Sequence, residues 1–173
     1  MVDSSEPGSA ADDTFTWREL WSETTAAIGD PIHARWLCET ASSTEPDEFL
    51  AELDTAAMKR MVGHLDAMVA RYRAGEPLQY VLGRWVFRRV DLAVDARVLI
   101  PRPETELVAA AAIGLAASIP DSRTVVDLGT GSGAIGLAVA DELPLNGTSV
   151  WLTDASADAL DVARANLAGL GRA

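Results

Sequence analysis

Apolar residues in the first part of the chain recur every three or four positions, which is the spacing of one helix face. Thr16 and Glu19 stand at the two ends of a capping box that begins the first helix. Further helices are expected over residues 32–41 and 55–74. The pattern therefore predicts an all-helical bundle over residues 14–75.

Beyond the bundle, the pattern changes to short runs that are rich in aromatic and β-branched residues. Leu78–Leu82 and Trp85–Val94 have the composition of strands and predict a hairpin. In Val98–Pro103, each residue before a proline is kept away from the helical conformation, so this segment is expected to be extended. We expect residues 76–101 to form a hairpin linker.

The remaining residues, 102–173, alternate between helical and strand patterns. The expected elements are a helix from Pro103 to about Ser118, a strand over 124–128, a helix over 133–143, a strand over 149–153 and a helix capped by Ser156. A strand, a helix and a second strand in this order predict a parallel βαβ unit with one crossover.

Composition and charge narrow the possible functions. The chain has 173 residues, 49% of them hydrophobic and 23% charged, which suits one or two small globular domains. Its net charge of −12 repels phosphate backbones, so direct binding to nucleic acid is not expected. Residues 1–13 lack the basic and apolar regions of a signal peptide, and we expect them to be a disordered tail. No apolar run reaches membrane-spanning length.

The cysteine and the two histidines do not indicate a reactive thiol or a metal site. Cys38 is the only cysteine, which excludes an internal disulfide and fits a reducing, cytoplasmic location. It lies in an apolar helical pattern, which favours a buried, inert thiol. His33 and His64 have no acidic or cysteine cluster around them, so no metal site is predicted. The aromatic residues expected in cores are Trp17, Trp21 and Trp36 in the bundle, and Tyr80, Trp85 and Phe87 in the hairpin.

A strand that runs into a glycine-rich loop is the strongest chemical signal in the chain. Val125–Leu128 leads into Gly129, Gly131 and Gly133, which let the backbone turn sharply and approach a ligand closely. The helix that follows presents free N–H groups at its start. Asp154, at the carboxyl end of the next strand, is placed to accept both ribose hydroxyls of an adenosine. This arrangement predicts an α/β, Rossmann-like domain that binds an adenosine-containing cofactor.

The loop alone does not distinguish NAD from S-adenosylmethionine. Gly129-x-Gly131-x-x-Ala134 satisfies the dinucleotide fingerprint, and Asp154 follows at a suitable distance for NAD. Two features favour S-adenosylmethionine. Asp127, directly before the loop, suits a cationic cofactor better than a pyrophosphate, and it could organise the glycine N–H groups or reach the cofactor's amino group. In addition, more than a hundred residues precede the loop, whereas many dinucleotide enzymes begin with this strand.

Several motifs on either side of the loop point to one family. In chain order they are Pro77–Gly83, Val98–Glu106, Asp127–Gly133, Thr153–Ser156, Ala159-Leu160 and Ala165-Asn166. Together they resemble the motifs of the release factor glutamine methyltransferases, the HemK/PrmC family. The Ile-Pro-Arg-Pro-Glu-Thr-Glu run is more specific than the glycine loop, and the helical bundle matches the family in kind rather than by motif.

The resemblance implies a reaction, a cofactor and a partner. The reaction is methyl transfer from S-adenosylmethionine to the side-chain amide of the glutamine in the Gly-Gly-Gln motif of peptide chain release factors. The release factor is the protein substrate, the helical bundle is its docking domain, and a cytoplasmic monomer is expected. The residues implied to bind the cofactor are Asp127, Gly129, Thr130, Gly131, Ser132, Gly133, Asp154 and Arg102. A helix start explains Glu104 and Glu106 without a ligand.

The family holds the substrate amide with an Asn-Pro-Pro-Tyr motif that this sequence lacks. Asn146 and Asn166 are its only asparagines, and neither precedes a proline. Two parallel strands with three helices cannot cover both faces and both edges of a sheet. We therefore expect residues 102–173 to be an incomplete, truncated methyltransferase domain and the chain to be inactive by itself, with no catalytic residue assigned.

Two alternative functions stay open at this point. The helical bundle could bind a release factor without any catalysis. Alternatively, the chain could be part of an NAD-binding oxidoreductase, since its glycine loop also satisfies that fingerprint.

Overall fold

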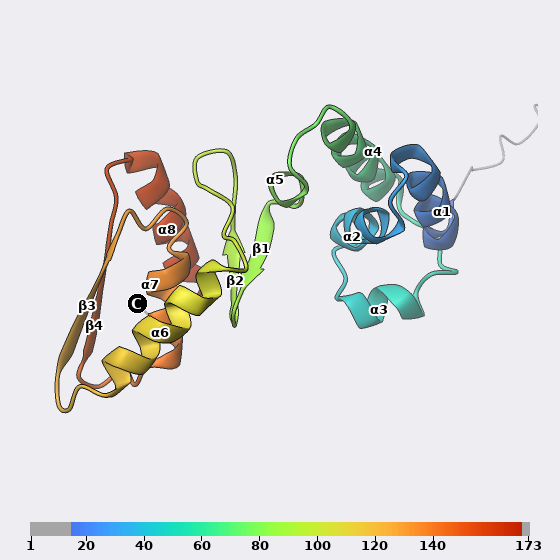
Figure 1. Cartoon of the computed structure of the whole chain (residues 1–173). Helices are drawn as coiled ribbons and strands as arrows, with labels where there is room; N and C mark the ends of the chain where they lie inside the picture. The colour runs from blue at the N-terminus through green and yellow to red at the C-terminus, as the bar shows by residue number, and fades with distance from the viewer. Residues whose placement is uncertain (1–14, 171–173) are drawn as a thin grey trace, which may run out of the picture. The chain divides into compact units, whose positions relative to one another are not determined.

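The structure is a computed structural model that describes residues 15–170. The expected tail over residues 1–13 lies outside the described residues. The chain divides into two compact units between Gly75 and Glu76. Figure 1 labels the helices and strands of each unit.

The first unit consists of helices joined by short connections. Its elements are α1 (Trp17–Ile28), α2 (Pro31–Ser42), α3 (Pro46–Ala51) and α4 (Lys59–Arg73) (Figure 1). The predicted capping box at the start of α1 is confirmed, because the Glu19 carboxylate accepts the backbone N–H of Thr16 at 2.9 Å. Gly29 ends α1 with a φ of 76°, a conformation that favours glycine.

Helix α4 begins later than its apolar pattern suggested, at Lys59 rather than near residue 55. The residues before α4 instead form backbone hydrogen bonds with Phe15 and Trp17. The N–H of Trp17 donates to the carbonyl of Thr55 at 3.2 Å, and the N–H of Ala57 donates to the carbonyl of Phe15 at 2.8 Å. These long-range hydrogen bonds give the residues before α4 backbone partners outside a helix.

The core of the first unit is built around Phe49, which is fully buried and meets Trp17 edge to face at a ring distance of 5.8 Å. Cys38 is also buried, as predicted, and burial raises the pKa of its thiol to about 12, so the thiol stays protonated and unreactive. Of the three tryptophans expected in this core, Trp17 is buried, while Trp21 and Trp36 are only half-buried. Trp21 still packs edge to face on Phe49, at a ring distance of 6.5 Å.

The second unit combines a hairpin with a βαβ unit. Its elements are α5 (Leu78–Leu82), β1 (Arg84–Phe87), β2 (Val90–Ala93), α6 (Thr105–Ala117), β3 (Arg123–Leu128), α7 (Ala134–Glu142), β4 (Thr148–Thr153) and α8 (Ala157–Gly169). The hairpin is real, but the prediction that Leu78–Leu82 is one of its strands is wrong, because this segment is a short helix. Pro77 precedes this helix and Gly83 ends it with a φ of 73°, and together they fix both of its ends.

Both hairpin strands come from the second apolar run instead. They pair antiparallel from Arg84 opposite Ala93 to Phe87 opposite Val90. Phe87 is buried, and Tyr80 and Trp85 pack against the same core, as expected for these aromatic residues.

Strands β3 and β4 are parallel, with Arg123 opposite Thr148 and Leu128 opposite Thr153, and α7 connects them. The predicted βαβ unit is therefore confirmed. Helices α6, α7 and α8 lie on one side of this sheet in Figure 1, and Val125 and Val150 face a core cluster on that side. The other face of the sheet exposes large apolar side chains, namely Val126 (52% exposed), Leu128 (79%) and Trp151 (63%).

The fold is thus α/β, with a helical unit, a hairpin and a two-stranded parallel sheet of Rossmann-like βαβ topology. Among residues 15–170, no helix is both long enough and apolar enough to cross a membrane.

Candidate cofactor-binding site

The glycine loop lies where β3 ends and α7 begins. Gly129, Gly131 and Gly133 have φ angles of 72°, 56° and 88°, which side chains rarely allow. A Cβ atom added to Gly129 or Gly131 would meet no other atom within 4 Å, whereas one at Gly133 would lie 2.8 Å from Cδ1 of Leu137. The backbone of the loop is therefore uncovered at its first two glycines and tightly packed where it joins α7.

The side chain of Asp127, on β3, holds this loop through two hydrogen bonds. Its Oδ2 atom accepts the hydroxyl of Thr130 at 2.6 Å and the backbone N–H of Gly136 at 2.9 Å. A Cβ atom on Gly136 would lie 3.1 Å from the same oxygen, which is tighter than an ordinary contact, so a side chain there would push against Asp127. One carboxylate thus ties the end of β3 to both the loop and the first turn of α7.

Asp154 holds the loop from the neighbouring strand. Its Oδ2 atom accepts the N–H of Gly131 at 2.9 Å, and its Oδ1 atom accepts the N–H of Ser156 at 2.9 Å. The hydrogen bonds from Ser156 and Gly131 lower the pKa of the Asp154 carboxyl, which keeps it ionised. A carboxylate has about four acceptor positions, so Asp154 can still accept a hydroxyl from a ligand.

Backbone hydrogen bonds complete the geometry of the loop. The N–H groups of Gly129 and Thr130 both donate to the carbonyl of Thr153, at 2.8 and 2.9 Å. The N–H of Gly133 donates to the carbonyl of Thr130 at 2.8 Å. Thr130 and Ser132 are 7% and 2% exposed, so little of either residue is open to a ligand.

Arg102 is exposed and lies just before α6. Within residues 15–170, no hydrogen bond or ion pair joins its guanidinium to the glycine loop. Glu106 has a structural partner, because its Oε1 atom accepts the backbone N–H of Arg88 in the hairpin turn at 3.1 Å. The structure therefore brings together every predicted cofactor-binding residue except Arg102.

Sequence reasoning missed one residue at this site. Asn166 of α8 is 5% exposed, and its Nδ2 atom donates to the carbonyl of Ser132 at 2.8 Å. The only signal in the sequence was its place in the Ala165-Asn166 motif, which gave no role to the side chain.

The chemistry of the loop suits an adenosine-bearing cation. Two carboxylates flank the uncovered backbone at Gly129 and Gly131, so the local charge is negative. A ribose would find acceptors at Asp154, and a positively charged group would be favoured near Asp127. The residues present therefore fit S-adenosylmethionine.

Other groups in the described residues do not form a competing site. No cluster of His, Cys, Asp and Glu within residues 15–170 could hold a metal ion. The ring of His33 lies 2.7 Å from the hydroxyl of Tyr72 and 3.4 Å from the carboxylate of Asp30, so it has structural partners, while His64 is exposed.

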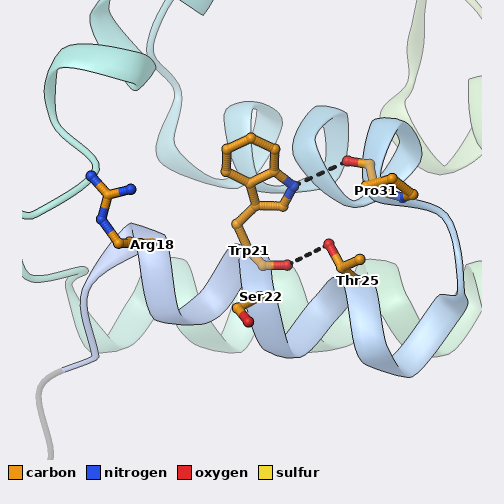
Figure 2. A pocket seen from close by; sticks show the side chains of 5 residues that line it. All are labelled: Arg18, Trp21, Ser22, Thr25 and Pro31. Atoms are coloured by element: carbon orange, nitrogen blue, oxygen red, sulfur yellow. Dashed lines mark hydrogen bonds between the residues drawn. The ribbon is translucent and has the colours of Figure 1, made fainter.

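A shallow pocket in the helical unit is lined by Arg18, Trp21, Ser22, Thr25 and Pro31 (Figure 2). Figure 2 shows that its polar groups bond to one another, because Nε1 of Trp21 donates to the carbonyl of Pro31 at 3.0 Å. Arg18 pairs with Asp54 at 2.6 Å. These bonds engage the indole of Trp21 and the guanidinium of Arg18 within the protein.

Comparison with known proteins gives the family. Residues 22–83 match the family model of the PrmC N-terminal domain, and residues 108–171 match that of the methyltransferase small domain. Three similar relatives are each named release factor glutamine methyltransferase. The relative from Gloeobacter violaceus is 50% identical over 101 residues, which cover 58% of this chain and 34% of that protein.

The other two relatives extend over more of the chain. The one from Burkholderia pseudomallei is 42% identical over 134 residues, 78% of this chain and 44% of that protein. The one from Moorella thermoacetica is 40% identical over 138 residues, 80% of this chain and 46% of that protein. The chain thus spans between a third and a half of the length of these relatives. The two matched domains in this order, together with relatives of one name, show that the chain belongs to the HemK/PrmC family of release factor glutamine methyltransferases.

Proposed function

We propose that the glycine loop of this chain binds S-adenosylmethionine and that the chain serves the methylation of a release factor glutamine. The observation that carries this proposal is the bond between Asp154 and the N–H of Gly131. It places an ionised carboxylate beside an uncovered glycine backbone, where a ribose and the methionine end of the cofactor can be held together.

The cofactor supplies an electrophilic methyl group when it is bound. The residues of this chain bind and orient it. Asp154 accepts the ribose hydroxyls, and the open backbone at Gly129 and Gly131 admits the rest of the molecule. The carboxylate of Asp127 adds a negative field that favours a sulfonium over a pyrophosphate. Arg102 is a further proposed contact, reached from the segment before α6.

The proposed substrate is the side-chain amide of the glutamine in a release factor's Gly-Gly-Gln motif. An amide nitrogen is a weak nucleophile, because its lone pair is delocalised into the carbonyl, so the acceptor must be held in line with the methyl group. The names of the relatives support release factors as the partner. We assign the docking of that partner to residues 14–75, which include most of the stretch that matches the PrmC N-terminal domain.

Calorimetric titration of the chain tests the cofactor. We expect S-adenosylhomocysteine to bind and NAD not to compete with it. Asp154→Ala should weaken the binding at least tenfold, because the ribose loses its acceptors and the loop loses its anchor at Gly131. Asp158→Ala removes an exposed acid from the first turn of α8 and is the matched control, with affinity expected within twofold of the unchanged chain.

Two results would contradict the proposed cofactor: binding of NAD in place of S-adenosylhomocysteine, or equal affinity in both variants. The substrate is tested separately by measuring binding of a release factor to the chain. Binding that survives Asp154→Ala would support docking through the helical unit, and absence of binding at every concentration tested would remove the release factor as partner.

A further inference from the structure

Asn166 makes three hydrogen bonds from a position that is almost fully buried. It lies on α8, and only 5% of it is exposed. Its Oδ1 atom accepts the N–H of Ala93 at 2.7 Å, and its Nδ2 atom donates to the carbonyl of Ala93 at 3.1 Å. The same Nδ2 atom donates to the carbonyl of Ser132 at 2.8 Å. One amide thus joins α8 to the hairpin and to the glycine loop.

The contact with Ala93 completes an edge of the hairpin. Residues of an antiparallel pair alternate between facing their partner strand with both backbone groups and facing away from it. Because the N–H of Val94 donates to the carbonyl of Gly83, the backbone groups of its neighbour Ala93 point away from β1. The amide of Asn166 meets both of them, as the peptide group of a third strand would.

The contact with Ser132 acts on the loop itself. Ser132 lies between Gly131, whose N–H donates to Asp154, and Gly133, whose N–H donates to Thr130. A hydrogen bond to the Ser132 carbonyl fixes the plane of the peptide between Ser132 and Gly133. Three side chains therefore hold the loop, namely Asp127 and Asp154 from the two strands and Asn166 from α8.

No other side chain satisfies all three partners of Asn166. Both hydrogens of its amide nitrogen are used, and its oxygen is used as an acceptor. Aspartate keeps the acceptor but loses both donor bonds, and leucine has a similar shape but loses all three bonds. Loss of the bond to Ser132 takes a partner from the carbonyl of a buried residue, since Ser132 is 2% exposed, whereas Ala93 is exposed and its backbone groups can turn to water.

We propose that Asn166 is a positioning residue that sets the cofactor-binding conformation of the loop and couples it to the hairpin. This inference rests on the proposed function of the loop. It assigns to Asn166 no contact with the cofactor, and its effect is transmitted through the backbone of Ser132.

Amide hydrogen exchange and calorimetry on the 173-residue chain test this role together. In Asn166→Leu, we expect the amides of Gly131 and Gly133 to exchange at least tenfold faster and the affinity for S-adenosylhomocysteine to fall about tenfold. Val139→Ala is the control, because Val139 is fully buried on α7 in the cluster with Ala116 and Leu143, away from the loop contacts. It should lower the melting temperature without changing either loop quantity more than twofold.

Asn166→Gln keeps the amide but moves it by one methylene, and it carries the test if Asn166→Leu does not fold. We expect loop exchange rates between those of the unchanged chain and Asn166→Leu. Unchanged exchange at Gly131 and Gly133 in a folded variant would overturn the proposal, as would equal acceleration in Val139→Ala. If the unchanged chain binds no S-adenosylhomocysteine, the proposed function fails, while the exchange rates still decide whether Asn166 holds the loop.

Discussion

Two carboxylates set the conformation of the loop, and both do so by accepting backbone or hydroxyl hydrogens rather than by pairing with cations. Asp127 accepts from Thr130 and Gly136, and Asp154 accepts from Ser156 and Gly131. At Asp154 these bonds lower the pKa of the carboxyl group and so stabilise its ionised form. The consequence can be measured at Asp154, where the hydrogen bond from Ser156 is the largest cause of the lowered pKa, followed by that from Gly131.

An acid titration followed by NMR at the Gly131 amide should report this pKa. The amide chemical shift is expected to change with a midpoint below the ordinary aspartate value of 3.8. Because the folded state lowers the pKa, the stabilisation from this carboxylate is complete above the pKa of the unfolded chain and is lost as the pH falls through the folded one. In Asp154→Asn the same amide should show no such transition. A midpoint at or above 3.8 would contradict the hydrogen bonding described for Asp154.

At the scale of elements, the sequence predicted the helices and strands whose ends carry local signals. The capping box of Thr16 and the cap of Ser156 both hold in the structure, and so does the βαβ unit around the glycine loop. The wrong predictions concern segments whose local pattern fits both helix and strand, or whose ends depend on hydrogen bonds between residues far apart in the chain. Leu78–Leu82 is an apolar run of five residues, too short for periodicity to separate helix from strand, although Pro77 and Gly83 were available as helix signals.

The late start of α4 had no local signal, because it depends on backbone pairing between residues far apart, such as Trp17 and Thr55. In the candidate site, too, some residues carry a local sequence signal and one does not. Its glycines and two aspartates follow directly from the strand–loop–helix pattern. Asn166 could not be found in this way, since Ala93 and Ser132 become its partners only when α8 packs on the hairpin and the loop.

The turn before β4 contains a glycine whose replacement by any other residue should cost stability. Gly147 has a φ of 78°, and a Cβ atom there would lie 2.3 Å from the carbonyl oxygen of Asp121. Gly147→Ala is therefore expected to destabilise the second unit by about 2 kcal/mol or more. Gly114→Ala is the control, because Gly114 lies in helix α6 with open space around it, and this change should stabilise by about 0.5–1 kcal/mol. Chemical denaturation measures both, and equal effects would contradict the turn geometry.

At the scale of the whole molecule, each of the two units has its own buried core. Leu65 of α4 is 2% exposed in the helical unit. Leu65→Ala should destabilise that unit by about 2–5 kcal/mol, through lost burial and the cavity left behind. Hydrogen exchange in α4 is expected to accelerate while the affinity for S-adenosylhomocysteine stays within twofold. A parallel loss of cofactor affinity would show that the units do not act independently.

The expectation of a monomer stays a prediction, and the outer face of the β3–β4 sheet bears on it. Val126, Leu128 and Trp151 stand on that face, each more than half exposed. Contiguous apolar surface of this kind favours association with other apolar surface, which the net charge of −12 opposes.

The fluorescence of Trp151 can report whether that sheet face is exposed to solvent. Its indole is 63% exposed, so its fluorescence should be emitted at long wavelength and be quenched by iodide in solution. Any apolar surface that covers this face of the sheet would shift that emission to shorter wavelength and shield the indole from the quencher. An emission spectrum, compared with that of Trp151→Phe, would therefore report whether this surface is covered or exposed to solvent in any preparation of the protein.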